Sequence, residues 1–232
     1  MADIVVAHGA WSAGWAWKKM RPLIAARGHV LWTPTYTGLG ERSHLARPEV
    51  NLSTHITDVA QVLEMEDLRE VVLIGHSYGG MVATGVADRV PERLERLIYL
   101  DAFVPEDGQS LAMLTGQDPE AWRATAEDGW KAQPRPMPPD TPRADLAWAM
   151  RRRMSHPIEC FLEPVRVTGA GARLPRDYIY ALKKDERDSF GRFYRRARME
   201  PSWAAHEIDA SHNPHITTPE LLAELLDGII RG

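Results

Sequence analysis

The sequence has little of what marks secreted, zinc-binding or membrane proteins. Cys160 is the single cysteine among 232 residues, so the chain cannot form an internal disulfide and shows no zinc pattern. We interpret Cys160 as a small packed hydrophobe. No stretch approaches the roughly 18 apolar residues of a membrane span, and residues 1–3 lead into an apolar run without a basic segment. We therefore expect a cytoplasmic protein that does not bind membranes.

A strong charge of one sign is also missing. The chain has 28 Lys and Arg against 32 Asp and Glu residues, which gives a net charge of -4, and the basic residues are scattered. Nucleic acid requires a positive field for its phosphates, so we predict that it is not a partner. The length is sufficient for one substantial core without a second, and we expect one domain.

Short apolar runs alternate with amphipathic stretches, a rhythm typical of βαβ crossovers and of a mainly parallel α/β sheet. Between about residues 104 and 173, prolines and tryptophans interrupt this rhythm. We predict a small helical lid, residues 104–173, inserted into a core of residues 1–103 and 174–232. The predicted strands are residues 4–7, 29–33, 71–75, 97–100, 178–182 and 206–208, and the predicted helices are residues 14–27, 53–66, 78–90, 189–199 and 219–230.

The most informative motif is GHSYG at residues 75–79, between an apolar run and a helical stretch. A strand that turns sharply into a helix through G-x-S-x-G is a nucleophile elbow, in which a strained backbone lifts the serine hydroxyl above the sheet. The alternative is a Gly/Ser turn without chemistry, and the flanking strand and helix argue against it. Ser77 is therefore the candidate nucleophile.

A serine nucleophile needs an imidazole to take its proton and a carboxylate behind that imidazole. His212 follows the last predicted strand, in the chain order Ser, Asp, His. We prefer it to His215, which we expect to line the pocket or cap a helix. For the carboxylate we rank Asp101, at the end of the fourth strand, ahead of Asp185, which lies in a charged loop after the fifth. The choice between the two aspartates stays open.

Two backbone N–H groups are expected to form an oxyanion hole, those of Ala10 in the loop after the first strand and of Tyr78 after the nucleophile. His8 and His76 are expected to pack and hydrogen-bond rather than to act as bases. Aromatic residues near the strand ends and in the lid could form an apolar pocket wall. The candidate substrate-binding residues are Trp11, Phe103, Trp122, Trp130 and Trp148.

Several motifs together resemble one branch of the α/β-hydrolase superfamily, which contains plant methyl-salicylate-type esterases, hydroxynitrile lyases and bacterial pyrethroid-hydrolase-like esterases. They are HGAW at residues 8–11, GLGER at 38–42, GHSYGG at 75–80, DAFVP at 101–105 and the segment around His212. The resemblance covers nearly the whole chain and implies a six-stranded sheet, a small cap, no metal and no cofactor. One departure is an acid loop about one residue longer at Asp185. Another is Asp101, whose position resembles that of the acid in haloalkane dehalogenases.

The resemblance also narrows the reaction. The lyases of this branch carry a threonine and a lysine at positions that look like Gly9 and Asn213 here, which disfavours nitrile cleavage. Ser77 excludes the carboxylate nucleophile of dehalogenases and epoxide hydrolases. We predict a serine carboxylesterase for small to medium hydrophobic esters, aromatic ones among the candidates, with a small-molecule ester as partner and a homodimer left open. The alternatives are a cofactor-free His/Asp base catalyst, lyase or oxygenase-like, and a non-catalytic ligand-binding homologue.

Overall fold

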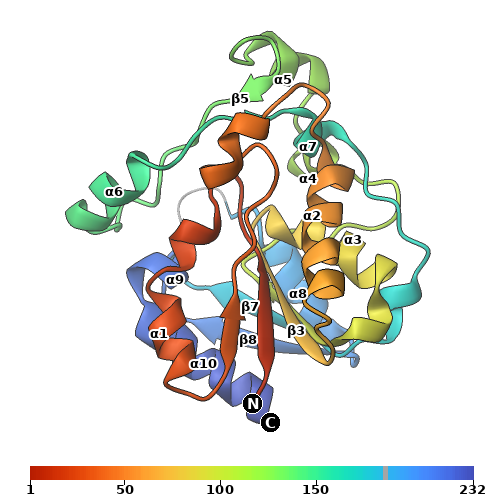
Figure 1. Cartoon of the computed structure of the whole chain (residues 1–232), viewed down its shortest axis with the longest axis vertical. Helices are drawn as coiled ribbons and strands as arrows, with labels where there is room; N and C mark the ends of the chain where they lie inside the picture. Colours follow the sequence, from red (N-terminus) through yellow and green to blue (C-terminus); the bar gives the residue numbers. More distant parts are fainter. Residues whose placement is uncertain (185–187) are drawn as a thin grey trace.

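The computed structural model describes residues 1–184 and 188–232. One six-stranded sheet has the strand order β2-β1-β3-β4-β7-β8, and each neighbouring pair is parallel (Figure 1). The predicted mainly parallel sheet is therefore confirmed. Its strands are β1 (Asp3–Ala7), β2 (Val30–Trp32), β3 (Val71–His76), β4 (Leu94–Leu100), β7 (Arg176–Ala181) and β8 (Trp203–Ile208).

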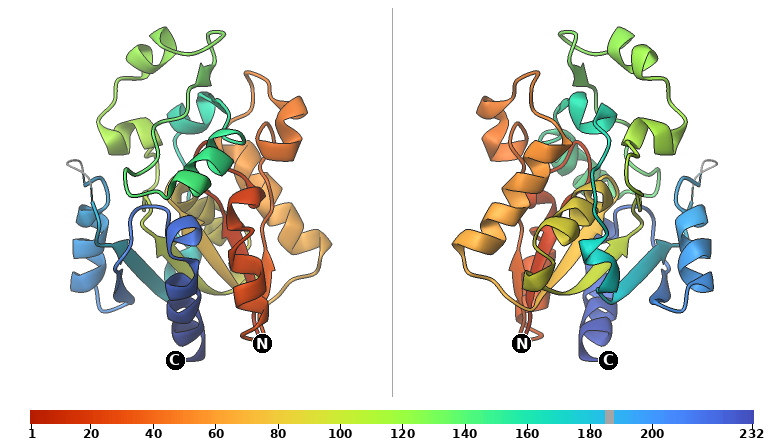
Figure 2. Two further views of the ribbon diagram at one scale, coloured as in Figure 1. Left: turned by 90° about the vertical axis from the view of Figure 1, so that its left-hand side faces the viewer. Right: turned by 90° about the vertical axis from the view of Figure 1, so that its right-hand side faces the viewer.

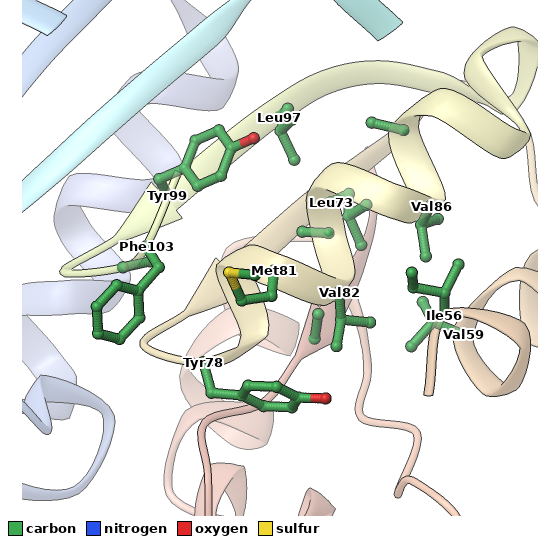
Figure 3. Packing of buried hydrophobic residues seen from close by; sticks show 14 of the residues in the cluster. Ile56, Val59, Leu73, Tyr78, Met81, Val82, Val86, Leu97, Tyr99 and Phe103 are labelled. Atoms are coloured by element: carbon green, nitrogen blue, oxygen red, sulfur yellow. The ribbon is translucent and has the colours of Figure 1, made fainter. Parts of the chain in front are cut away.

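The central strand β3 shows why the sheet forms. All of its residues are buried, as expected for a continuous apolar strand that is covered on both faces of a parallel sheet. Leu73 belongs to the hydrophobic cluster on one face and Ile74 to the cluster on the other. Figure 3 shows the first cluster, in which Leu73 lies near Val82 of helix α3 (Gly79–Arg89), and Val59 lies beside Ile56 on helix α2 (Leu52–Met65).

Helices cover both faces of the sheet. Helix α2 begins with a capping box, in which the Asn51 side chain accepts a hydrogen bond from the Thr54 N–H at 2.9 Å. The helix predicted over residues 14–27 is instead two short helices, because Pro22 lacks an N–H and fits only in the first turn of a new helix. The core helices are α1 (Met20–Ala25), α2 (Leu52–Met65), α3 (Gly79–Arg89), α8 (Gly191–Met199), α9 (Pro214–Thr217) and α10 (Pro219–Arg231), with 3-10 helices η1 (Gly14–Trp17), η2 (Gly40–Leu45) and η3 (Pro91–Arg93).

The predicted lid segment, residues 104–173, includes the elements at the end of the molecule opposite to the two termini (Figure 2). Besides short helices it contains an antiparallel ladder of two strands, which the prediction of a helical insertion did not include. The domain boundaries themselves stay a prediction. The segment consists of α4 (Leu111–Thr115), α5 (Pro119–Ala124), β5 (Lys131–Ala132), α6 (Arg143–Met150), β6 (His156–Pro157), α7 (Glu159–Leu162) and η4 (Ala170–Arg173).

The structure bears out the expectation for the single cysteine and can be searched for membrane-spanning helices. Cys160 is buried as a free cysteine, as predicted. Within residues 1–184 and 188–232, we find no helix with the length and apolar character needed to cross a membrane.

Candidate active site

Ser77 occupies a strained turn between β3 and α3. Its φ is 56°, in the left-handed region that non-glycine residues rarely adopt. The chain must also pass very close to β1 here, since a Cβ at Gly79 would lie 2.0 Å from the Ala7 carbonyl oxygen. The strand, turn and helix predicted around the GHSYG motif are all present, and they hold the serine hydroxyl at the carboxyl edge of the sheet.

His212 links Ser77 to Asp101. Its Nε2 lies 2.9 Å from Ser77 Oγ, and its Nδ1 lies 2.7 Å from Asp101 Oδ2. The imidazole stacks on the Phe190 ring with a centroid separation of 4.9 Å and an interplanar angle of 10°. His76 Nε2 donates a hydrogen bond of 2.8 Å to the His212 carbonyl oxygen. Phe190 thus holds the ring of His212, and His76 holds its backbone.

Asp101 is an almost fully buried carboxylate, 1% exposed, at the end of β4. Its Oδ1 accepts hydrogen bonds from the Lys184 ammonium and, at 3.3 Å, from the Ala181 N–H. Burial by itself would raise the pKa of Asp101, but the hydrogen bonds and charges of His212 and Lys184 outweigh it and lower the pKa. Asp101 is therefore ionised at neutral pH.

The other aspartate considered from the sequence, Asp185, lies outside the described residues. The hydrogen-bonded chain from Ser77 through His212 thus leads to Asp101 among the residues that the structure describes. Lys184 is a neighbour of this carboxylate that the sequence reasoning missed. Only the fold reveals it, because no sequence pattern pairs a charged loop after one strand with an aspartate after another.

The other candidate histidines are buried and neutral. Burial lowers the pKa of His8 to about 4 and that of His76 to about 3. His8 Nε2 accepts a hydrogen bond from the Tyr36 N–H at 3.3 Å. His215 lines the cavity, as expected, and stacks on Trp17 at 4.5 Å. These contacts agree with the packing and hydrogen-bonding roles expected from the sequence.

The loop after β1 lies directly against the nucleophile. A Cβ at Gly9 would be 3.3 Å from Ser77 Cβ and 2.9 Å from His76 Nδ1, so glycine allows this close approach. Within the described part of the chain, neither the Ala10 N–H nor the Tyr78 N–H donates a hydrogen bond to the protein. Both N–H groups are therefore unused among the described residues, as an oxyanion hole requires.

A cavity of about 710 Å³ contains Ser77 and His212 in its wall. Trp11, Phe103 and Trp122 line it, and so do Leu111, Met137 and Phe190. Trp130 and Trp148 are not among the described lining residues, and their role in substrate binding stays a prediction. Trp148 instead packs edge-on against Trp15 at 5.0 Å, and Trp130 carries the Lys131 ammonium 4.6 Å from its ring centroid.

His55, His156 and Cys160 form a buried group whose donor atoms lie within 4.8 Å of one another. It does not fit a metal ion. His55 Nε2 donates to the Thr37 carbonyl at 3.1 Å, while His156 Nδ1 accepts from the Trp11 N–H at 3.2 Å, which leaves the proton on His156 Nε2. Both Nε2 atoms are therefore protonated, and burial raises the pKa of the Cys160 thiol. The group is a hydrogen-bonded part of the core.

Comparison with known proteins agrees with this geometry. Residues 4–225 match the alpha/beta hydrolase family. The chain belongs to this family. Over 239 aligned residues it is 37% identical to the carbendazim hydrolyzing esterase of Nocardioides sp. (strain SG-4G), covering 97% of this chain and 98% of that protein.

Two further similar proteins indicate which branch of the α/β-hydrolase superfamily the chain resembles. The pyrethroid hydrolase of Sphingobium wenxiniae is 26% identical, over 97% of this chain and 86% of that protein. An extracellular alpha/beta-hydrolase from a Paenibacillus species has the same fold, with a TM-score of 0.80 at 22% identity, over 97% of this chain and 98% of that one. The predicted α/β-hydrolase fold and branch are thereby confirmed.

Proposed function

We propose that this protein is a serine carboxylesterase in which Ser77 is the nucleophile, His212 the proton carrier and Asp101 the acid. The observation that carries the proposal is the continuous chain of hydrogen bonds from Asp101 Oδ2 through His212 to Ser77 Oγ, in the wall of a cavity. The similarity to a carbendazim hydrolyzing esterase over nearly the full chain supports it. The protein is a carboxylic ester hydrolase.

In the first half of the reaction, Ser77 Oγ attacks the carbonyl carbon of the ester while its proton moves to His212 Nε2. The ionised Asp101 stabilises the imidazolium that results. The carbonyl oxygen becomes an oxyanion and accepts hydrogen bonds from the N–H groups of Ala10 and Tyr78, each worth about 3 kcal/mol in a site shielded from water. The tetrahedral intermediate then collapses. The alcohol leaves with the proton of His212, and the acyl group remains on Ser77.

In the second half, a water molecule attacks the acyl-enzyme and gives its proton to His212. Collapse of the second tetrahedral intermediate returns this proton to Ser77 Oγ and releases the carboxylic acid. One ester and one water therefore give one acid and one alcohol. The backbone strain at Ser77 keeps its hydroxyl within reach of His212 in both halves.

The cavity supports the predicted substrate class, small to medium hydrophobic esters with aromatic ones among them. Its volume of about 710 Å³ lies in the range of pockets that enclose small organic ligands. Trp11, Phe103, Trp122 and Phe190 contribute aromatic surface to its wall. The cytoplasmic location stays a prediction, to be checked by cell fractionation. The sequence left a homodimer open, and light scattering would measure the oligomeric state.

A test compares wild type with Ser77→Ala on p-nitrophenyl acetate, p-nitrophenyl butyrate and a methyl benzoate. Wild type should hydrolyse at least one of them and react with a fluorophosphonate, whereas Ser77→Ala should lose on the order of 10⁴-fold or more in turnover and remain unlabelled. The thermal unfolding of the variant should stay close to that of wild type. Turnover that survives the substitution would instead favour the base-only enzyme, and a correctly folded wild type without turnover or labelling would favour the ligand-binding homologue.

A further inference from the structure

Trp11, the residue after the proposed oxyanion donor Ala10, is tied to the lid segment by two hydrogen bonds. Its backbone N–H donates to His156 Nδ1 at 3.2 Å, and its indole Nε1 donates to the Ala132 carbonyl oxygen at 2.9 Å. Ala132 and His156 are register partners in the β5–β6 ladder. One residue pair of the lid ladder thus accepts hydrogen bonds from both N–H groups of Trp11, in the loop beside Ser77.

Trp11 has a strained backbone conformation that neighbouring residues must stabilise. Its φ is 56°, which is unfavourable for an L-residue with a bulky side chain and persists only where the surroundings stabilise it. The N–H that His156 accepts belongs to the peptide unit joining Ala10 to Trp11. If this hydrogen bond were lost, the loop could relax toward a common φ, and the Ala10 N–H, one peptide unit upstream, would no longer be held in place.

The burial and the protonation state of His156 indicate that the hydrogen bond to its Nδ1 is the reason for a histidine at this position. The side chain is 0% exposed, and burial lowers its pKa well below the ordinary value, so it is neutral. Because Nδ1 accepts the Trp11 N–H, the proton lies on Nε2, which has no acceptor among the described residues. An unpaired buried donor is costly, and an apolar side chain would avoid that cost.

His156 is also in contact with the other side of the proposed oxyanion hole. Its ring stacks on Phe161 with centroids 4.5 Å apart, and it meets the Tyr78 ring edge-on at 5.1 Å. Tyr78 supplies the second proposed oxyanion donor. The same imidazole therefore contacts Trp11, which follows the first donor, by a hydrogen bond, and Tyr78, which carries the second donor, by ring packing.

We propose that His156 is a positioning residue that, by accepting the Trp11 N–H, keeps the Ala10 N–H aimed at the oxyanion beside Ser77. The oxyanion hole is then complete only while the β5–β6 ladder lies on the loop, which couples the placement of the lid to the chemical step. This inference rests on the proposed esterase function. His156 does not touch the reacting atoms, so its effect appears in the turnover step rather than in ground-state binding.

The test compares three substitutions at this position. His156→Asn keeps an acceptor near the place of Nδ1, His156→Gln offers one near the place of Nε2, and His156→Leu has none. For p-nitrophenyl butyrate we expect kcat of the Leu and Gln variants to fall about 10-fold to 100-fold with KM changed less than about 3-fold, since an oxyanion interaction acts in the transition state. The Asn variant should recover most of the loss.

Lys131→Ala, in the same ladder, is the matched control. Lys131 is paired with Asp128 and Trp130 rather than with the loop after β1, so kcat should stay near the wild-type value. Thermal unfolding of every variant separates lost activity from lost fold. If the Leu variant does not fold, the comparison of Asn with Gln carries the test.

Equal kcat in the Asn, Gln and Leu variants, or a change confined to KM, would overturn the inference and leave His156 as a packing residue. That outcome would not touch the proposed function as long as Ser77→Ala abolishes turnover and fluorophosphonate labelling of the wild type. Conversely, turnover retained in Ser77→Ala would remove the proposed function whatever the His156 variants do.

Discussion

The two sides of the active-site cavity are built differently. On the sheet side, Ser77 and Asp101 end the strands β3 and β4, and both have a left-handed backbone, with φ values of 56° and 43°. On the lid side, the helices have eight residues or fewer, and many of their residues are exposed. The nucleophile and the acid thus lie at the ends of buried strands, while the lid, apart from the His156 contact with the loop, shapes the pocket with short and more exposed elements.

The largest effect that would test this contrast is expected from Asp101→Asn. The amide cannot stabilise the His212 imidazolium and can hold its ring in the wrong tautomer, so turnover should fall on the order of 10⁴-fold. Steady-state hydrolysis of p-nitrophenyl butyrate measures this. Asp185→Asn is the matched control and should change turnover little. A larger loss in Asp185→Asn than in Asp101→Asn would reverse the assignment of the acid.

Substituting one glycine on each side by alanine compares how tightly the sheet side and the lid side are packed. A Cβ at Gly79 would meet the backbone of β1, so Gly79→Ala should lower the free energy of unfolding by about 3 kcal/mol or more. In the lid, Gly129 has nothing within 4 Å of an added Cβ and a φ of 78°, so Gly129→Ala should cost about 1 kcal/mol. Urea denaturation measures both values. Equal losses would contradict the contrast.

The buried histidines should make stability depend on pH. Burial lowers the pKa of His55 and His76 to about 3, whereas an unfolded histidine titrates at about 6.5. The unfolded state therefore binds more protons below pH 6.5. Each such histidine should reduce the free energy of unfolding by about 1.4 kcal/mol per pH unit as the pH falls from 6.5 toward 4.

Urea denaturation between pH 7.5 and 5 would follow this loss of stability. Burial lowers the pKa of His215 well below the usual value, and this residue lies on the sheet side. Replacing it, as in His215→Phe, should remove one histidine's share of the slope. A profile of equal slope in wild type and His215→Phe would mean that His215 does not stay neutral in the folded protein.

The smallest effect is expected from the lid wall. Trp122 lines the cavity and packs edge-on against Phe161 at 4.7 Å. Trp122→Ala should raise KM for aromatic esters about 10-fold with little change in kcat, because it removes apolar contact that substrate and transition state share. Trp130→Ala, outside the described lining, should leave KM unchanged. A loss of kcat in Trp122→Ala would show that this part of the lid also positions the chemistry.

The sequence predicted the residues whose positions depend on near neighbours in the chain. It did not predict those whose positions depend on contacts with distant segments. The turn at Ser77 was predictable because strand, glycines and helix are neighbours in the chain, and His212 because it follows the last strand. The acid was ambiguous, since two aspartates follow strands and a linear sequence does not show which one reaches the imidazole. The sequence could not show which lid tryptophans face the cavity, because Trp148 lies in a helix of only eight residues and Trp130 in a turn, and neither segment has enough periodicity to show which way a side chain points.

By itself, the amino-acid sequence determined the succession of strands and helices, the burial of the central strands and the strained turn that carries Ser77. Each of these depends on glycines, prolines and apolar spacing within a few residues. Only the tertiary structure decided that Asp101 lies on His212, 111 positions away, and that His156 meets Trp11, 145 positions away. Such contacts depend on how the sheet and the lid pack together, because hydrogen bonds between distant segments leave no local pattern in the chain.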